Sequence, residues 1–131
     1  MAIVCLDTNV LIAHKRAKKA DKDQTFLYRL AIQSYQFAVS TVTVYELLQG
    51  DNQDEDQYWQ VMFKNMQILV FDYTCAGEAA KIYETLKKKG KLIEAEDIFI
   101  AATALRYQMP LATGNVKHFE RVEGLALIKA F

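Results

Sequence analysis

The stretch that decides the fold is Ala2-Ile3-Val4-Cys5-Leu6-Asp7-Thr8-Asn9-Val10-Leu11-Ile12-Ala13, close to the start of the chain. Its first part is short, apolar and rich in β-branched residues, which predicts a buried strand over residues 3–6. Asp7-Thr8-Asn9 interrupts the apolar run, and Val10 begins a helix. A buried strand that leads straight into a helix is typical of the units from which parallel sheets are built.

Apolar strands and helices keep alternating along the rest of the chain. Further strands are predicted over residues 37–42, 67–71 and 111–113, with a fifth over 125–128 at an edge; helices are predicted over 21–35, 43–49, 74–89 and 92–107, with another that ends near Met66. This order predicts an α/β fold with three layers, α/β/α, around a mainly parallel central sheet of about four to five strands. Residues 1–131 contain no repeat and no boundary signal, so we expect a single domain.

Composition narrows the class of protein. Apolar residues make up 52% of the 131 residues, which is enough for a continuous core. Lys and Arg together number 16, as do Asp and Glu, so the chain does not coat nucleic acid by bulk charge alone. The basic residues are nevertheless clustered, in His14-Lys15-Arg16 with Lys18-Lys19 and in Lys87-Lys88-Lys89 with Lys91. Such clusters are either solvated helix ends or sites for the phosphates of RNA.

The cysteines and the N-terminus indicate a cytoplasmic protein. Cys5 and Cys75 lack metal-binding or redox spacing, so we expect buried, reduced thiols. Positive charge follows the first apolar stretch instead of preceding it, unlike in a signal peptide. No apolar run approaches the ~18 residues that a membrane span needs, so no membrane partner is expected.

Three acidic residues, Asp7, Glu46 and Asp97, lie in or beside apolar segments. An ionised carboxylate pressed against apolar surface costs roughly several kcal/mol unless a partner or a metal compensates it. No Lys or Arg stands nearby in any of the three segments. Sites in parallel α/β sheets form beyond the carboxyl ends of strands, and both Asp7 and Glu46 follow strands. Convergence of the three acids there would create a site for a hard divalent cation.

Each acid also has a simpler interpretation. Asp7 could cap the helix that follows it, although capping and metal binding can coexist. Glu46 matches a capping box with Thr43, in which its carboxylate would reach back to the cap amide. Asp97 could be satisfied by backbone amides near a helix start. Against this, its neighbours at helical spacing place it on a buried stripe: Ile93, Ile100, Ala101 and Ala104.

More polar groups follow the predicted strand over residues 111–113. Asn115 is usually a turn residue, but with Thr113 it could support a metal or ligate a metal-bound water. His14 and His118 are each solitary, which indicates structural or surface roles. Ligands that are all oxygen favour Mg²⁺ or Mn²⁺ over Zn²⁺. Such an ion can polarise a phosphate and activate water for attack on a phosphodiester bond.

Four segments, in order, resemble the motifs of PIN-domain ribonucleases, and the resemblance covers essentially the whole chain. They are Val4-Cys5-Leu6-Asp7-Thr8-Asn9-Val10-Leu11-Ile12, Ser40-Thr41-Val42-Thr43-Val44-Tyr45-Glu46-Leu47-Leu48-Gln49-Gly50, Asp97-Ile98-Phe99-Ile100-Ala101-Ala102-Thr103-Ala104 and Ala112-Thr113-Gly114-Asn115-Val116-Lys117-His118-Phe119. Length and motif style are similar to VapC toxins of prokaryotic toxin–antitoxin pairs. The resemblance implies a metal-dependent endoribonuclease that cuts RNA, is usually a homodimer and is inhibited by a cognate antitoxin.

The same resemblance implies roles for the acids. Asp7, Glu46 and Asp97 would form the acidic triad. Asp7 and Asp97 would hold Mg²⁺ or Mn²⁺, while Glu46 orients or deprotonates the attacking water. Asn115 and Thr113 would be supporting ligands. Many family members carry a fourth acid where this chain has Asn115, so chemistry with one metal ion is expected.

Two other classes of protein share features with this sequence. A phosphatase of the haloacid dehalogenase type also begins with an Asp at a strand end, but it needs a second Asp where this chain has Asn9. A PIN-like module that binds RNA or a protein without cutting is the main alternative, and a metal requirement would distinguish the nuclease from it. The apolar stripe from Tyr58 to Met66 is either core or an interface.

Overall fold

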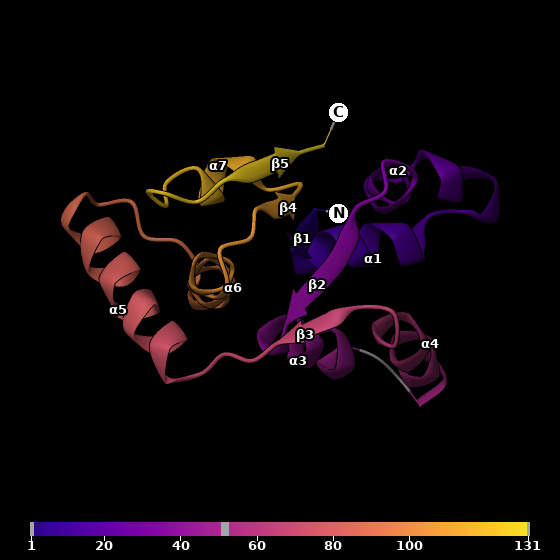
Figure 1. Ribbon diagram of the computed structural model, residues 1–131, viewed down its shortest axis with the longest axis horizontal. Coiled ribbons are helices and arrows are strands. Elements are labelled where there is room, and N and C mark those ends of the chain that lie inside the picture. Colours follow the sequence, from indigo (N-terminus) through magenta and orange to yellow (C-terminus); the bar gives the residue numbers. More distant parts are fainter. Residues whose placement is uncertain (1, 51–52, 131) are drawn as a thin grey trace.

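A five-stranded parallel sheet lies at the centre of the protein (Figure 1). The structure is a computed structural model that describes the backbone of residues 2–50 and 53–130 and the side chains of residues 2–50 and 57–130. The strands, in spatial order, are β3 (Gln67–Leu69), β2 (Gln36–Ser40), β1 (Ile3–Leu6), β4 (Leu111–Thr113) and β5 (Leu127–Lys129). Every neighbouring pair is parallel. The predicted α/β fold is confirmed, including the short fifth strand at an edge.

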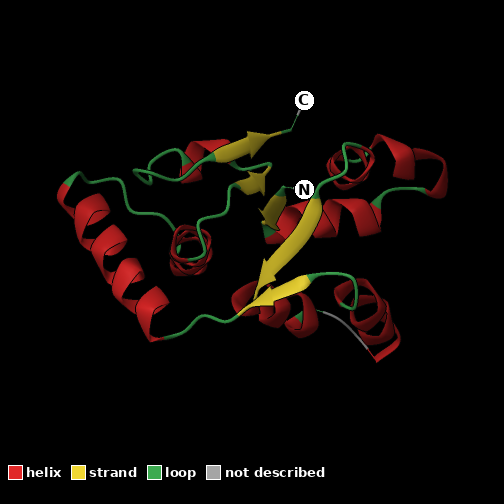
Figure 2. Cartoon of the chain, in the orientation of Figure 1, coloured by secondary structure: helices red, strands yellow, loops and turns green. Residues whose placement is uncertain are grey.

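Helices connect the strands and cover both faces of the sheet (Figure 2). They are α1 (Thr8–Arg16), the 3-10 helix η1 (Lys19–Gln24), α2 (Phe26–Ile32), α3 (Thr41–Gln49), α4 (Gln53–Phe63), α5 (Tyr73–Lys88), α6 (Ala95–Arg106) and the short α7 (Val116–Phe119). Figure 1 shows α5 and α6 on one side of the sheet, with α1 and α2 on the other.

Alternate residues of β1 pack against the helices on the two faces of the sheet. Val4 and Leu6 are buried in a cluster with apolar residues of α1, α2 and α4, whereas Cys5 is buried in the cluster that contains α5 and α6. Burial of both faces explains why this strand is apolar at every position. The arrangement is the three-layer α/β/α architecture that the sequence predicted.

The apolar stripe from Tyr58 to Met66 belongs to the core. Trp59 is fully buried, and its ring stacks on Phe63 with 6.1 Å between the ring centroids. Tyr58, Met62 and Met66 are partly buried against the same cluster. The stripe therefore packs α4 against the core of the protein. Of the two interpretations, core or interface, the structure supports the core.

Some predicted boundaries were wrong because side-chain caps start helices where the apolar pattern shows no break. The helix predicted over residues 21–35 is η1 followed by α2, because the Thr25 hydroxyl caps α2 by accepting a hydrogen bond from a first-turn amide at 3.2 Å. The strand predicted over residues 37–42 ends at Ser40, whose hydroxyl accepts from an α3 amide at 3.0 Å.

Other boundaries differ from the prediction too. The strands predicted over residues 67–71 and 125–128 are observed at Gln67–Leu69 and Leu127–Lys129. The helix predicted over residues 92–107 begins only at Ala95, so Ile93 precedes it and Asp97 lies in its first turn. The acidic connection predicted over residues 51–56 falls partly outside the described residues, and from Gln53 onward the described backbone is helical.

Cys5 and Cys75 are both buried and neither forms a disulfide, as expected. Within residues 2–50 and 53–130, no helix combines the length and the apolar character required to cross a bilayer.

Candidate active site

The carboxyl ends of β1 and β4 meet where the strand order reverses. The chain runs outward from β1 to β2 and β3, and then returns to place β4 on the other side of β1. In open parallel sheets, ligands bind at such a switch point, beyond the carboxyl ends of the strands. Asp7 directly follows β1, and Thr113 ends β4.

Asp7 is held at this edge by two hydrogen bonds. Its side chain is buried, with 4% of the residue exposed. Oδ1 accepts a hydrogen bond from the Thr8 amide at 2.8 Å, so Asp7 caps α1 as its simpler interpretation predicted. Oδ2 accepts from Thr113 Oγ1 at 2.7 Å. A carboxylate offers about four acceptor positions, so these two bonds leave capacity for a metal.

Glu46 reaches the same edge from α3. Its Oε1 accepts a hydrogen bond from Thr8 Oγ1 at 2.6 Å, and that hydroxyl also lies 3.1 Å from Thr43 Oγ1. The capping-box interpretation of Glu46 was wrong, because Ser40 and not Thr43 caps α3. With α3 starting at Thr41, Glu46 lies in the second helical turn, and its carboxylate turns toward α1.

Asp97 is half-buried in the first turn of α6. Its Oδ2 lies 3.3 Å from His118 Nδ1, and the same nitrogen lies 2.8 Å from Asn115 Nδ2. Among the described residues, no backbone amide donates to the Asp97 carboxylate, so its interpretation as an acid satisfied by a helix start is not supported. Nδ1 either donates to the Asp97 carboxylate or accepts from the Asn115 amide nitrogen, because one ring nitrogen carries either a proton or a lone pair. When it accepts from the amide nitrogen, the Asn115 oxygen remains available as an acceptor.

A chain of polar contacts links all four predicted site residues. The chain of contacts runs Glu46–Thr8–Asp7–Thr113–Asn115–His118–Asp97, with the Asn115 amide donating to Thr113 Oγ1 at 2.9 Å. These residues come from four separate segments of the sequence. The fold therefore gathers, at one edge of the sheet, the acids that the sequence analysis singled out.

The electrostatics of this edge favour a cation. Desolvation by burial raises the pKa of Asp7 to about 6, and the charges of Asp97 and Glu46 add to the rise; hydrogen bonds from Thr113 and Thr8 oppose it. Burial also raises the pKa of Asp97, although His118 lowers it. In the part of the chain that the structure describes, none of the three carboxylates pairs with a Lys or Arg. A divalent cation would supply the missing positive charge.

The donors at this edge suit a hard metal ion in their chemistry. Carboxylate oxygens of Asp7 and Asp97, with the amide oxygen of Asn115, are the ligands that Mg²⁺ and Mn²⁺ prefer. The described side chains nevertheless contain no group of three or more His, Cys, Asp and Glu residues arranged closely enough to hold a metal. The fit of a metal here rests on donor type and uncompensated charge.

Sequence reasoning missed two residues of this edge. His118, for which the sequence indicated a structural or surface role, contacts Asp97 and Asn115. Its position three residues after Asn115, on one face of a helical turn, was the available signal. Thr8 follows Asp7 directly and connects it to Glu46. His14 lies away from these contacts and hydrogen-bonds Thr25 Oγ1 at 2.6 Å, in keeping with a structural role.

The arrangement of motifs corresponds to a known domain. A sequence profile of the PIN domain matches residues 4–125. The chain belongs to the PIN-domain family. The matched residues include β2, β3 and β4, all of β1 except Ile3, and every acid of the candidate site, whereas β5 follows the match.

Two curated relatives are similar to this PIN domain over most of its length. Ribonuclease VapC1 of Methanocaldococcus jannaschii is 36% identical over 91 residues, which are 69% of this chain and 67% of the relative. Ribonuclease VapC2 of Haemophilus influenzae is 30% identical over 125 residues, which are 92% of each chain. Among solved structures, VapBC-1 from nontypeable Haemophilus influenzae has a TM-score of 0.81 at 25% identity and covers 97% of each chain. This PIN domain is therefore of the VapC type.

Proposed function

We propose that this PIN domain, a single domain over residues 1–131, is an endoribonuclease that requires Mg²⁺ or Mn²⁺ and acts as the toxin of a toxin–antitoxin pair. The observation that carries the proposal is the chain of polar contacts that gathers Asp7, Glu46 and Asp97 without a balancing Lys or Arg among the described residues. The names of the VapC relatives, both ribonucleases, support RNA as the substrate. The place of action that we propose is the cytoplasm.

Asp7 and Asp97 are the residues that would hold the ion, with Asn115 and Thr113 in support. When bound, the ion would polarise the phosphate and lower the pKa of a nearby water. Asp7 is already oriented for this task, because the Thr8 amide fixes one oxygen and the Thr113 hydroxyl fixes the other. His118 orients Asp97 when its Nδ1 carries the proton.

Glu46 is the residue that would orient the attacking water or accept its proton. Thr8 donates to Oε1 at 2.6 Å, which leaves Oε2 as an acceptor. Because Thr8 also donates its backbone amide to Asp7, one residue sets the positions of the proposed base and of a proposed metal ligand. This coupling gives Thr8 a positioning role.

The test of this function is cleavage of total RNA and purified tRNA by the full chain. We expect discrete RNA fragments in the presence of Mg²⁺ or Mn²⁺, no fragments with EDTA, and recovery of cleavage when the metal is restored in excess. The cognate antitoxin, a small protein partner, should suppress the same fragments. RNA that stays intact at high enzyme and metal concentration, yet binds to the chain, would instead support the non-catalytic RNA- or protein-binding module.

A homodimer is part of the same proposal, and an apolar groove between α5 and α6 is its proposed interface. The groove has a volume of about 460 Å³, and its lining includes Phe71, Tyr83 and Phe99 with small alanines. Tyr73, at the start of α5, is 94% exposed. Exposed apolar surface of this kind is typical of protein interfaces, and soluble homo-oligomers are most often dimers with twofold symmetry.

Charge placed in this groove should separate the dimer. Ala80 lines the groove and is exposed, so Ala80→Glu introduces a carboxylate without disturbing the core. We expect light scattering to give twice the 15.0 kDa chain mass for the wild type and one chain mass for this variant. Lys81→Glu, at an exposed position that does not line the groove, is the matched control and should remain dimeric. A dimeric Ala80→Glu protein would place the interface elsewhere.

A further inference from the structure

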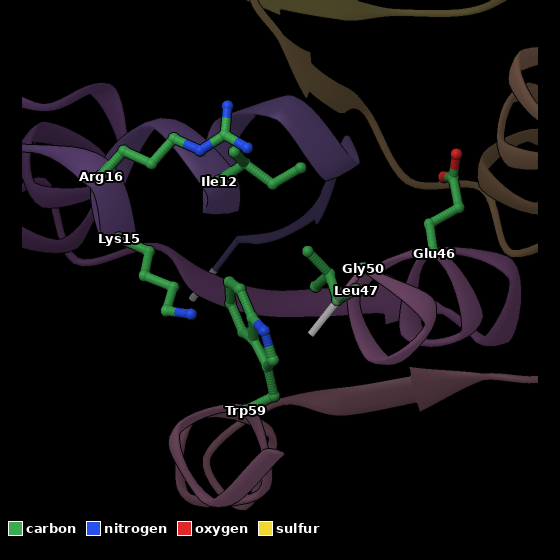
Figure 3. Close-up of a pocket in the computed structure, with 7 residues that line it drawn as sticks. All are labelled: Ile12, Lys15, Arg16, Glu46, Leu47, Gly50 and Trp59. Carbon is green, nitrogen blue, oxygen red and sulfur yellow. The ribbon is translucent and has the colours of Figure 1, made fainter. Parts of the chain in front are cut away.

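A second hollow adjoins the candidate active site, between α1, α3 and α4 (Figure 3). Its volume is about 320 Å³, and its lining includes Lys15 and Arg16 from α1, Glu46 and Leu47 from α3, and Trp59 from α4. In Figure 3 the Glu46 carboxylate lies at the far end of the hollow and points away from Lys15 and Trp59. Glu46 thus belongs to both places, and the hollow continues directly from the proposed catalytic edge.

Trp59 brings an unused hydrogen-bond donor to this hollow. The residue is 1% exposed, and its Nε1 is buried without an acceptor among the described residues. Its ring is fixed by an edge-on contact with Tyr58, at 4.9 Å between centroids, and by the stack on Phe63. Buried donors nearly always have a partner in native proteins, so an orphaned indole N–H in the wall of a hollow indicates a ligand that accepts a hydrogen bond.

Two cations flank the same hollow. Lys15 Nζ lies over the ring faces of Tyr58 and Trp59, at 5.4 and 5.5 Å from their centroids. Arg16 is exposed, and in the described part of the chain its guanidinium forms no hydrogen bond or ion pair. The nearby carboxylate of Glu46 is engaged by Thr8 and turned away. The exposed guanidinium of Arg16 and the indole N–H of Trp59 both line the hollow, and such donors favour an anion with acceptor oxygens.

We propose that this hollow binds a backbone phosphate of the RNA strand next to the phosphate that is cut. The proposal rests on the proposed nuclease function. A strand whose scissile phosphate lies beside Glu46 passes the hollow, because Glu46 forms its far wall. The guanidinium of Arg16 matches phosphate geometry, and basic grooves that follow the backbone are the usual means of holding single-stranded RNA. Trp59 is too buried to stack on a base, so its part is the indole N–H.

Tryptophan fluorescence reports directly on this hollow, since Trp59 is the single tryptophan of the chain. The full chain is titrated with a short single-stranded RNA in EDTA, which prevents cleavage, at several salt concentrations. We expect RNA to change the Trp59 emission. Arg16→Gln should weaken binding about tenfold and raise KM, with kcat little changed, in metal-supported cleavage. It should also reduce the slope of log affinity against log salt by about 0.7, the value for one phosphate contact.

The matched control removes the same charge at the opposite edge of the sheet. Lys64 is exposed and lines a separate hollow beside the starts of β1 and β2, so Lys64→Gln should bind RNA within about twofold of the wild type. Equal affinity and salt slope for Arg16→Gln and wild type, with RNA still cut, would overturn the phosphate site and leave the nuclease intact. A polyglutamate peptide that changes the Trp59 emission when RNA does not would also overturn it, in favour of an acidic protein segment. A wild type that neither cuts nor binds RNA would overturn the proposed function itself.

Discussion

The Asp97→Asn variant is expected to lose RNA cleavage by about 100-fold or more and to keep its fold. Asn has the same shape as Asp but offers one neutral oxygen where the carboxylate offers two charged ones. The Asp97 carboxylate lies in the first turn of α6, half-buried, and its one side-chain contact in the described chain is with His118. Removing the charge therefore removes a proposed metal ligand while the apolar contacts of α6 stay in place.

The neighbouring acid provides a matched control. Glu96 lies in the same first turn but is exposed, so Glu96→Gln makes the same change of charge one residue away. Its cleavage rate should stay within about twofold of the wild type, because an exposed charge near a helix start has only a modest effect. The rates are measured on total RNA in Mg²⁺, with thermal unfolding followed by circular dichroism. Equal losses in both variants, or unfolding of Asp97→Asn, would assign Asp97 a structural role.

The sequence predicted the framework of this site because the framework depends on local patterns. Uniformly apolar strands followed by helices identify a parallel sheet, and a parallel sheet places its strand ends at one edge. That reasoning placed Asp7 and Asn115 correctly from their positions alone. The strand order places β4 beside β1, which brings the segments of Asp7 and Asn115 together. This order cannot be predicted from a local sequence pattern.

Contacts between distant segments account for what the sequence did not predict. Glu46 and Thr43 have the spacing of a capping box, yet Glu46 is engaged by Thr8, which is 38 residues away. Ser40 is the residue that caps α3, because its hydroxyl accepts a hydrogen bond from the Val42 amide. The helix therefore begins earlier than the apolar pattern predicted. His118 was set aside because it is solitary in sequence, whereas its partner Asp97 is 21 residues away. Solitary polar residues can be assigned only when the topology that brings partners to them is known.

The Asp7→Asn variant should lose cleavage and, without metal, become more stable than the wild type at neutral pH. Burial raises the folded-state pKa of Asp7 from 3.8 to about 6. A carboxyl whose pKa is raised on folding stabilises the protein when protonated, below pH 3.8, and that contribution is lost as the pH rises through about 6. Above pH 6 the ionised Asp7 is therefore destabilising, by about 3 kcal/mol at most.

Asn removes this penalty and keeps the local structure. It caps helices as well as Asp does, so the hydrogen bond from the Thr8 amide is retained. The hydrogen bond from Thr113 is to the other oxygen, and its loss reduces the gain, so we expect a net stabilisation of about 1–2 kcal/mol at pH 7.5. The difference between variant and wild type should shrink as the pH falls through 6 and should disappear or reverse near pH 4.

Metal should reverse the order of stability. An ion that binds only the folded state raises the stability of the wild type in proportion to the logarithm of its concentration, whereas Asp7→Asn lacks a charged ligand and should respond little. The measurement is urea unfolding at pH 7.5, 6 and 4, each with EDTA and with Mg²⁺. Glu84→Gln, which neutralises an exposed acid on α5, is the control and should follow the wild type under every condition. An Asp7→Asn protein that is less stable than the wild type in EDTA at pH 7.5 would show that the Asp7 carboxylate holds the fold together, and that burial of its charge is already compensated without a metal.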